Sequence, residues 1–259
     1  MRDEYKKPII NIEINDLLWQ LIQKIQSILR EKFVGMYIGG SIANNSFDLE
    51  TSDIDCYIVT SNILSEHRRH KIEEMHKHFY SSQLPYAKKI EASYIPQDDL
   101  LNFNASSTRP YFNEGSFYLG EYGSNFIIEL FMLKEKGITI TGPDIKKLIK
   151  EISIQDLQNA IKKNLMEYWE PSLQNLSKYK RNDYQVFAIF TMCRTLYTLE
   201  MNSIVSKAEA AKWAMNKLDS KWKLLIEQAI AWQQNSDLNK QEESLEFVRY
   251  VINEVRPRS

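Results

Sequence analysis

The chain has 259 residues, 43% of them apolar and 26% charged, with a formal net charge of −1. This composition is typical of a globular protein, and the near-neutral charge predicts neither a general affinity for nucleic acid nor an acidic disordered chain. Acidic residues near the N-terminus, and Glu129 inside the most apolar run, argue against a signal peptide and a membrane span. Cys56 and Cys193 lie far apart in apolar segments, which favours reduced thiols. We therefore expect a cytoplasmic monomer that binds neither nucleic acid nor membranes.

The first third of the chain alternates between helical and extended patterns. Apolar residues recur at helical spacing over residues 15–32, and two short apolar runs, 33–39 and 54–60, predict strands. Residues 65–81 form a polar helical pattern that contains all four histidines, which we expect to be solvated rather than to bind a metal ion. The alternation of apolar and polar residues over 87–95 predicts a third strand.

The middle of the chain combines an irregular stretch with one helix. Residues 97–123 contain many aromatic residues among Asn, Ser and Gly, and they predict no single regular element. Residues 126–136 have a helical pattern, and residues 137–144 form a short extended piece closed by Gly142-Pro143.

After about residue 145 the pattern is helical throughout. Ser153 and Ser206 each begin a sequence with the spacing of a capping box, in which a serine and an acidic side chain satisfy free backbone N–H groups. We therefore predict an α+β protein, with a mixed-sheet domain over residues 1–150 and an all-α helical bundle over residues 151–259.

Asp53 and Asp55 lie at the start of the second predicted strand. Residues i and i+2 of a strand point to the same side, so the two carboxylates lie next to each other while Ile54 faces the core. Like charges at short range repel and lose hydration as the fold forms, a cost that a bound cation removes. Oxygen ligands favour Mg²⁺ or Mn²⁺, and Mg²⁺ commonly takes its other ligands from water and substrate phosphates. The pair therefore predicts a divalent metal site that acts on a phosphate substrate.

Gly39, Gly40 and Ser41 follow the first predicted strand. Glycines let backbone N–H groups approach an anion closely, and the serine hydroxyl can donate one further hydrogen bond. A Gly-Gly-Ser turn and an Asp-x-Asp pair are each common alone. A phosphate cradle followed by a metal-binding pair, in this order and between two strands, is far more specific and indicates nucleotidyl transfer.

The same residues carry a resemblance to a known superfamily. Gly40-Ser41, the intervening loop and Asp53-Ile54-Asp55 resemble the signature of the DNA polymerase β-type nucleotidyltransferases. Residues 195–213, TLYTLEMNSIVSKAEAAKW, and the following AMNKL are similar to the C-terminal domain of the spectinomycin/streptomycin adenylyltransferases, which modify aminoglycoside antibiotics. The resemblance covers nearly the whole chain. It implies a nucleotidyltransferase domain followed by a helical substrate-binding domain.

The resemblance implies roles for individual residues. Asp53 and Asp55 are expected to hold Mg²⁺, with two ions expected, and ATP is expected to be the co-substrate. Lys207 is expected to reach the triphosphate from the helical domain. The expected nucleotide-binding residues are Gly40, Ser41, Ser52, Asp53, Asp55 and Lys207.

Glu91 is the expected catalytic base. It is the only acid in the third predicted strand and points opposite Ile90 and Ala92, so it lies near the aspartates if the second and third strands are neighbours. The alternative interpretation is an exposed strand acid paired with Lys89.

The implied reaction is AMP transfer from Mg-ATP to a hydroxyl group of an aminoglycoside-type antibiotic, which confers resistance. Spectinomycin is the first expected acceptor and streptomycin the second, because residues 110–122 lack the tryptophan that the family places there. Carboxylates and flat aromatic rings suit such a polycation. The candidate acceptor-binding residues are Glu91, Tyr118, Trp169 and Asp183.

Two other functions are compatible with the motifs. The chain could be a nucleotidyltransferase for another small molecule or for a protein hydroxyl, although the long helical domain argues against the minimal antitoxin form. It could also be a non-catalytic nucleotide-binding module, although a degenerate site would not need Asp53, Asp55 and Glu91 together.

Overall fold

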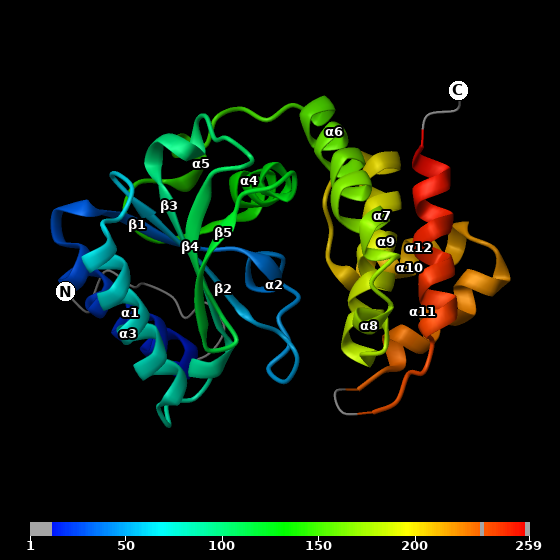
Figure 1. Cartoon of the computed structure of the whole chain (residues 1–259), viewed down its shortest axis with the longest axis horizontal. Coiled ribbons are helices and arrows are strands. Elements are labelled where there is room, and N and C mark those ends of the chain that lie inside the picture. Colours follow the sequence, from blue (N-terminus) through cyan, green and yellow to red (C-terminus); the bar gives the residue numbers. More distant parts are fainter. Residues whose placement is uncertain (1–11, 234–235, 257–259) are drawn as a thin grey trace. The chain divides into compact units, whose positions relative to one another are not determined.

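The computed structural model describes residues 12–233 and 236–256. The chain divides into two compact units, Met1–Glu151 and Ile152–Ser259. The first unit contains a sheet with helices packed on it, and the described part of the second unit consists of helices and their connections (Figure 1). This architecture confirms the predicted α+β fold.

The first unit is built on one six-stranded sheet. Its strands follow the order β5-β4-β3-β2-β1-β6, in which β2 and β3 are parallel and the other paired strands are antiparallel. The strands are β1 (Phe33–Ile38), β2 (Ile54–Thr60), β3 (Ile90–Pro96), β4 (Thr108–Asn113), β5 (Ser116–Glu121) and β6 (Ile138–Thr141). The helices are α1 (Ile12–Leu29), α2 (Gly40–Ala43), α3 (Glu66–Ser81), α4 (Asn125–Lys136) and α5 (Ile145–Leu148), and the 3-10 turns are η2 (Arg30–Lys32), η3 (Ala87–Lys89) and η4 (Gln97–Leu100).

Helices α1 and α3 cover one face of this sheet and lie side by side (Figure 1). The apolar side chains of β2 belong to the same buried cluster as Leu21 of α1 and Ile72 of α3. These strand residues are Ile54, Cys56 and Ile58. Because side chains alternate along a strand, Asp55 and Tyr57 point to the opposite face of the sheet.

The stretch 97–123, for which the sequence predicted no single regular element, contains the hairpin of β4 and β5. Its two-residue turn is Glu114-Gly115, and both residues have positive φ angles, 47° and 78°. Such turns match the twist of paired strands, and glycine adopts them without strain. The Glu-Gly pair between two aromatic runs was the signal that our sequence interpretation missed.

The expectation that all four histidines are solvated is wrong for His76. This side chain is fully buried, its Nε2 lies 2.8 Å from the Tyr94 hydroxyl, and its ring stacks on Phe112. Burial disfavours the charged imidazolium and lowers the pKa of His76 to about 3. His76 is therefore a neutral core residue of α3.

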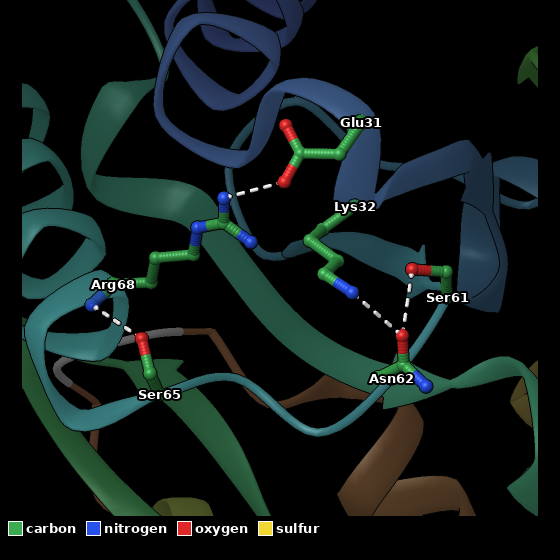
Figure 2. A network of polar contacts seen from close by, with 6 residues as sticks. All are labelled: Glu31, Lys32, Ser61, Asn62, Ser65 and Arg68. Carbon is green, nitrogen blue, oxygen red and sulfur yellow. Dashed lines mark hydrogen bonds and ion pairs between the residues drawn. The ribbon is translucent and has the colours of Figure 1, made fainter.

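A polar network joins η2 and the end of β2 to the start of α3 (Figure 2). The Arg68 guanidinium donates to Glu31 at 2.7 Å, which lowers the pKa of that carboxyl group, and the Lys32 ammonium donates to Asn62 at 2.8 Å. A basic surface cavity of about 470 Å³ lies beside this network and is lined by Ser27, Ile28, Arg30, His67, Arg68 and Lys71. It opens between α1 and α3, on the face of the sheet that Asp55 does not share.

The second unit packs around its longest helix, α9 (Asn182–Met201), which contacts α6, α8, α10, α11 and α12. The others are α6 (Ile154–Asn164), α7 (Glu170–Ser172), α8 (Leu176–Tyr179), α10 (Lys207–Lys217), α11 (Ser220–Ala231) and α12 (Gln241–Val255), and a π-helical turn, η5 (Leu165–Trp169), joins α6 to α7. Both predicted capping boxes are present at the N-termini of α6 and α10. Among the described residues, no helix is both long enough and apolar enough to cross a membrane.

Candidate active site

Asp55 and Glu91 are direct neighbours on two parallel strands. Asp55 of β2 and Glu91 of β3 are Cα partners in the sheet register, and Ile54 pairs with Ile90 beside them on the core side. Asp53 immediately precedes β2. The sequence prediction required the second and third strands to be neighbours, and the sheet has them in that order.

Gly40 lies directly against the Asp55 carboxylate. Its φ angle is +56°, and a Cβ atom built on it would lie 1.6 Å from Asp55 Oδ2. The backbone N–H of Gly39 donates to the Asp55 carbonyl at 3.0 Å. The Gly-Gly-Ser turn and the Asp55 carboxylate therefore lie together in one site, and a side chain at position 40 would displace that carboxylate.

Ser41 contributes a buried hydroxyl to the same turn. Its Oγ atom has no hydrogen-bond partner within the described part of the chain. A buried hydroxyl without a partner is energetically costly, so such atoms in native proteins commonly meet a bound ligand or water.

Ser52 closes the loop that leads into Asp53. Its Oγ accepts a hydrogen bond from the Asp48 backbone N–H at 3.0 Å, and its own N–H donates to the Asp48 carbonyl at 3.0 Å. The hydroxyl proton of Ser52 takes no part in the first bond and can be donated to an anion.

Arg109 and Glu129 bring two further charges to the sheet face of Asp55. Arg109 of β4 is fully buried, and its guanidinium donates to Glu129 of α4 at 2.6 Å. Burial raises the pKa of Tyr57 well above its ordinary value; Glu129, Asp55 and Glu91 raise it further, whereas Arg109 lowers it. The three carboxylates and the guanidinium therefore all lie within electrostatic range of the Tyr57 hydroxyl. The sequence contained a sign of Glu129, because this charged residue interrupts the most apolar run, but no sequence pattern indicated Arg109 as its partner.

We expect Arg109→Met to destabilise the protein by about 3 kcal/mol, because it leaves the Glu129 carboxylate without its cation in a largely buried position. Urea unfolding measures the change. Arg68→Met is the matched control, because it removes an ion pair with the exposed Glu31, and solvent-exposed pairs contribute little to stability. Equal losses in the two variants would contradict this description of Arg109.

Tyr118 lies near Glu91. Its ring stacks on Tyr111 with 5.7 Å between centroids, and 47% of the residue is exposed. Burial and then the Glu91 carboxylate raise the pKa of Tyr118, which puts its hydroxyl within electrostatic range of that acid. Tyr118 thus offers an aromatic surface beside the candidate base.

The remaining candidates belong to the second unit. Trp169 ends the π-helical turn and is buried against Tyr184 and Phe187. Asp183 forms an ion pair with Arg181, whose hydrogen bond lowers the pKa of the carboxyl group.

Lys207 is the first residue of α10, directly after the N-cap Ser206, and it is exposed. The ligand contacts predicted for Lys207, Trp169 and Asp183 stay predictions.

Asp53 and Asp55 are oxygen donors, the ligand type that suits Mg²⁺. No group of three or more His, Cys, Asp or Glu side chains that could hold a metal ion occurs among the described residues. A pair of carboxylates provides only part of the oxygen ligands that Mg²⁺ requires. Gly40 lies against Asp55, and the Ser41 hydroxyl has no hydrogen-bond partner within the described residues, so both are free to face a phosphate whose oxygens would supply further ligands to the metal ion.

Both units of the chain are similar in sequence to known proteins. Residues 147–256 match the family described as aminoglycoside adenylyltransferase, C-terminal domain. A spectinomycin 9-adenylyltransferase of Campylobacter jejuni is 27% identical over 217 residues, which is 80% of each chain. An aminoglycoside (3'')(9) adenylyltransferase of Escherichia coli is 24% identical over 258 residues, 94% of this chain and 95% of the other.

A solved structure has the same fold. The crystal structure of a spectinomycin adenyltransferase from Enterococcus faecialis with ATP and spectinomycin superposes with a TM-score of 0.73 and 19% identity, covering 93% of this chain and 98% of the other. The chain thus has the fold of this structure, and the named relatives are adenylyltransferases, a class of nucleotidyltransferase. Residues 147–256 therefore resemble the C-terminal domain of the aminoglycoside adenylyltransferases, and the alignments with the named relatives extend over most of both units.

Proposed function

We propose that this protein transfers AMP from ATP to a hydroxyl group of an aminoglycoside-type antibiotic and so confers resistance, acting as a cytoplasmic monomer. Spectinomycin is the first candidate acceptor and streptomycin the second. The observation that carries the proposal is the pairing of Asp55 with Glu91 across two parallel strands, with Gly40 packed on the Asp55 carboxylate. This geometry supports a site in which Asp55 would bind the metal ion, Glu91 beside it would act as the base, and the turn at Gly40 would hold phosphate.

Asp53 and Asp55 would hold Mg²⁺, with two ions proposed. When bound, Mg²⁺ neutralises charge on the triphosphate and assists departure of pyrophosphate. Every other contribution comes from the protein's own residues. Backbone N–H groups at Gly40 and the hydroxyl groups of Ser41 and Ser52 would donate to phosphate oxygens, which gives the buried Ser41 Oγ the partner it otherwise lacks.

Glu91 would act as the general base. Its carboxylate accepts the proton of the acceptor hydroxyl while that oxygen forms a bond to the α-phosphorus of ATP. The bond between the α-phosphorus and the bridging oxygen breaks, and pyrophosphate leaves with the electron pair. The products are an O-adenylylated acceptor, pyrophosphate and a proton held on Glu91.

The second unit would supply the remaining contacts. Lys207 would donate to the triphosphate as a mobile cation, in line with its exposed place at the start of α10. Trp169 and Asp183 would contribute to acceptor binding together with Tyr118 of the first unit. Aromatic faces and a carboxylate are the groups that attract a cationic, hydroxyl-rich ligand.

Incubation with ATP, Mg²⁺ and spectinomycin, followed by mass spectrometry and a pyrophosphate assay, tests the proposal. We expect one equivalent of pyrophosphate for each AMP added to the antibiotic, and a slower reaction with streptomycin. Reactions without acceptor, and the Asp55→Asn variant, are the controls. Binding of ATP without any modification of either antibiotic would contradict the proposed acceptor class.

A further inference from the structure

Lys89 ties the start of β3 to the loop that leads into β2. It is the last residue of the η3 turn, and its Nζ atom donates to the Glu50 carbonyl at 2.7 Å and to the Ser52 carbonyl at 3.1 Å. Both carbonyls lie in the loop before Asp53. One ammonium group therefore connects the segment that carries the candidate base with the segment that carries a candidate metal ligand.

The loop that Lys89 holds is a closed turn. Asp48 Oδ1 accepts hydrogen bonds from the Glu50 N–H at 2.9 Å and the Thr51 N–H at 2.8 Å. Ser52 and Asp48 exchange two more bonds, each of 3.0 Å. Because these bonds close the turn, a contact at Glu50 and Ser52 restrains residues 48–52 together.

Lys89 reaches this loop directly ahead of the paired part of the two strands. The register of the parallel strands pairs Ile54 with Ile90, the residues that follow Asp53 and Lys89. The ammonium of Lys89 therefore adds charge-assisted hydrogen bonds between the two segments that lead into β2 and β3.

We infer that Lys89 is a positioning residue for AMP transfer: by holding the 48–52 turn, it sets the place of Asp53 relative to Asp55 and Glu91. This inference rests on the proposed function, because it assigns Asp53 to the metal site. Partners that orient metal ligands typically change metal affinity or activity by about 10- to 100-fold when they are removed.

The test compares Lys89→Met with Lys89→Arg and with Lys88→Met. Lys88 is the matched control, because this neighbour is exposed and its ammonium lies over the ring of Tyr80, 6.0 Å from the ring centroid. We expect Lys89→Met to lower kcat about tenfold or more and to raise the Mg²⁺ concentration for half-maximal rate, with KM for the acceptor unchanged. Lys89→Arg should restore most of the rate, since a guanidinium can donate to both carbonyls.

Amide hydrogen exchange at residues 50–53 provides a readout that needs no activity. We expect faster exchange in Lys89→Met and wild-type exchange in Lys88→Met. Unchanged exchange in Lys89→Met would overturn the inference, whether or not the wild type transfers AMP. A wild type that transfers no AMP would count against the proposed function alone. Faster exchange with unchanged kcat and Mg²⁺ requirement would also overturn it, because the loop would then be loosened without effect on the reaction.

Discussion

Replacing Glu91 with glutamine is expected to lower kcat by about 100- to 10,000-fold, because the amide keeps the shape of the side chain but cannot accept the acceptor's proton. In a sensitive bacterium, cells that express Glu91→Gln should lose the protection against spectinomycin that the wild type gives. Pyrophosphate release with purified protein gives the same comparison without uptake effects. Thermal unfolding should stay near that of the wild type, since the exchange removes charge without changing volume.

A matched comparison separates the base from general damage to the acidic site. Glu121→Gln makes the same chemical change at an exposed acid at the end of β5, and it should leave the rate near that of the wild type. If Glu91→Gln protects cells as well as the wild type does, the assignment of Glu91 as the base is wrong. Asp55 would then be the next residue to test.

Gly40→Ala is expected to reduce kcat by about 100-fold, because the new methyl group occupies the space of a carboxylate oxygen. The built Cβ lies 1.6 Å from Asp55 Oδ2, so Asp55 must turn away from its place beside Glu91. Misplacement of a reacting group by about 1 Å can cost that much in rate. Steady-state kinetics with saturating ATP and acceptor measures the loss.

Gly123→Ala is the control for backbone strain. Gly123 also has a positive φ angle, 62°, but nothing lies within 4 Å of a Cβ atom built there. Both variants bear the cost of a left-handed alanine, about 1–2 kcal/mol of stability, and only Gly40→Ala adds the collision. If the two variants lost activity equally, strain alone would explain the effect.

The centre of the site was predictable because local sequence patterns determine it. Two apolar runs fixed β1 and β2, and the alternation around Glu91 fixed which side of β3 faces the core. Once β2 and β3 are neighbours, their parallel register brings Asp55 next to Glu91. The α+β fold and the resemblance to the adenylyltransferases followed from the same sequence patterns.

Other parts of the site depend on contacts between distant segments, which a sequence pattern does not contain. Arg109 and Glu129 meet only because α4 packs over β4. His76 looked solvated because α3 is strongly polar, yet it lies on the side of the helix that meets Phe112. The side-chain bonds of Lys89 to backbone carbonyls have no sequence signature at all.

The parallel register of β2 and β3 has a consequence for how this protein can change over evolutionary time. Side chains repeat every two residues along a strand, so one residue inserted within either strand would turn every later side chain over. An insertion just before Glu91 would put the inserted residue opposite Asp55 and turn the Glu91 side chain toward the core. Length variation should therefore accumulate in the connections on either side, and lineages that alter these two strands should do so by substitution alone.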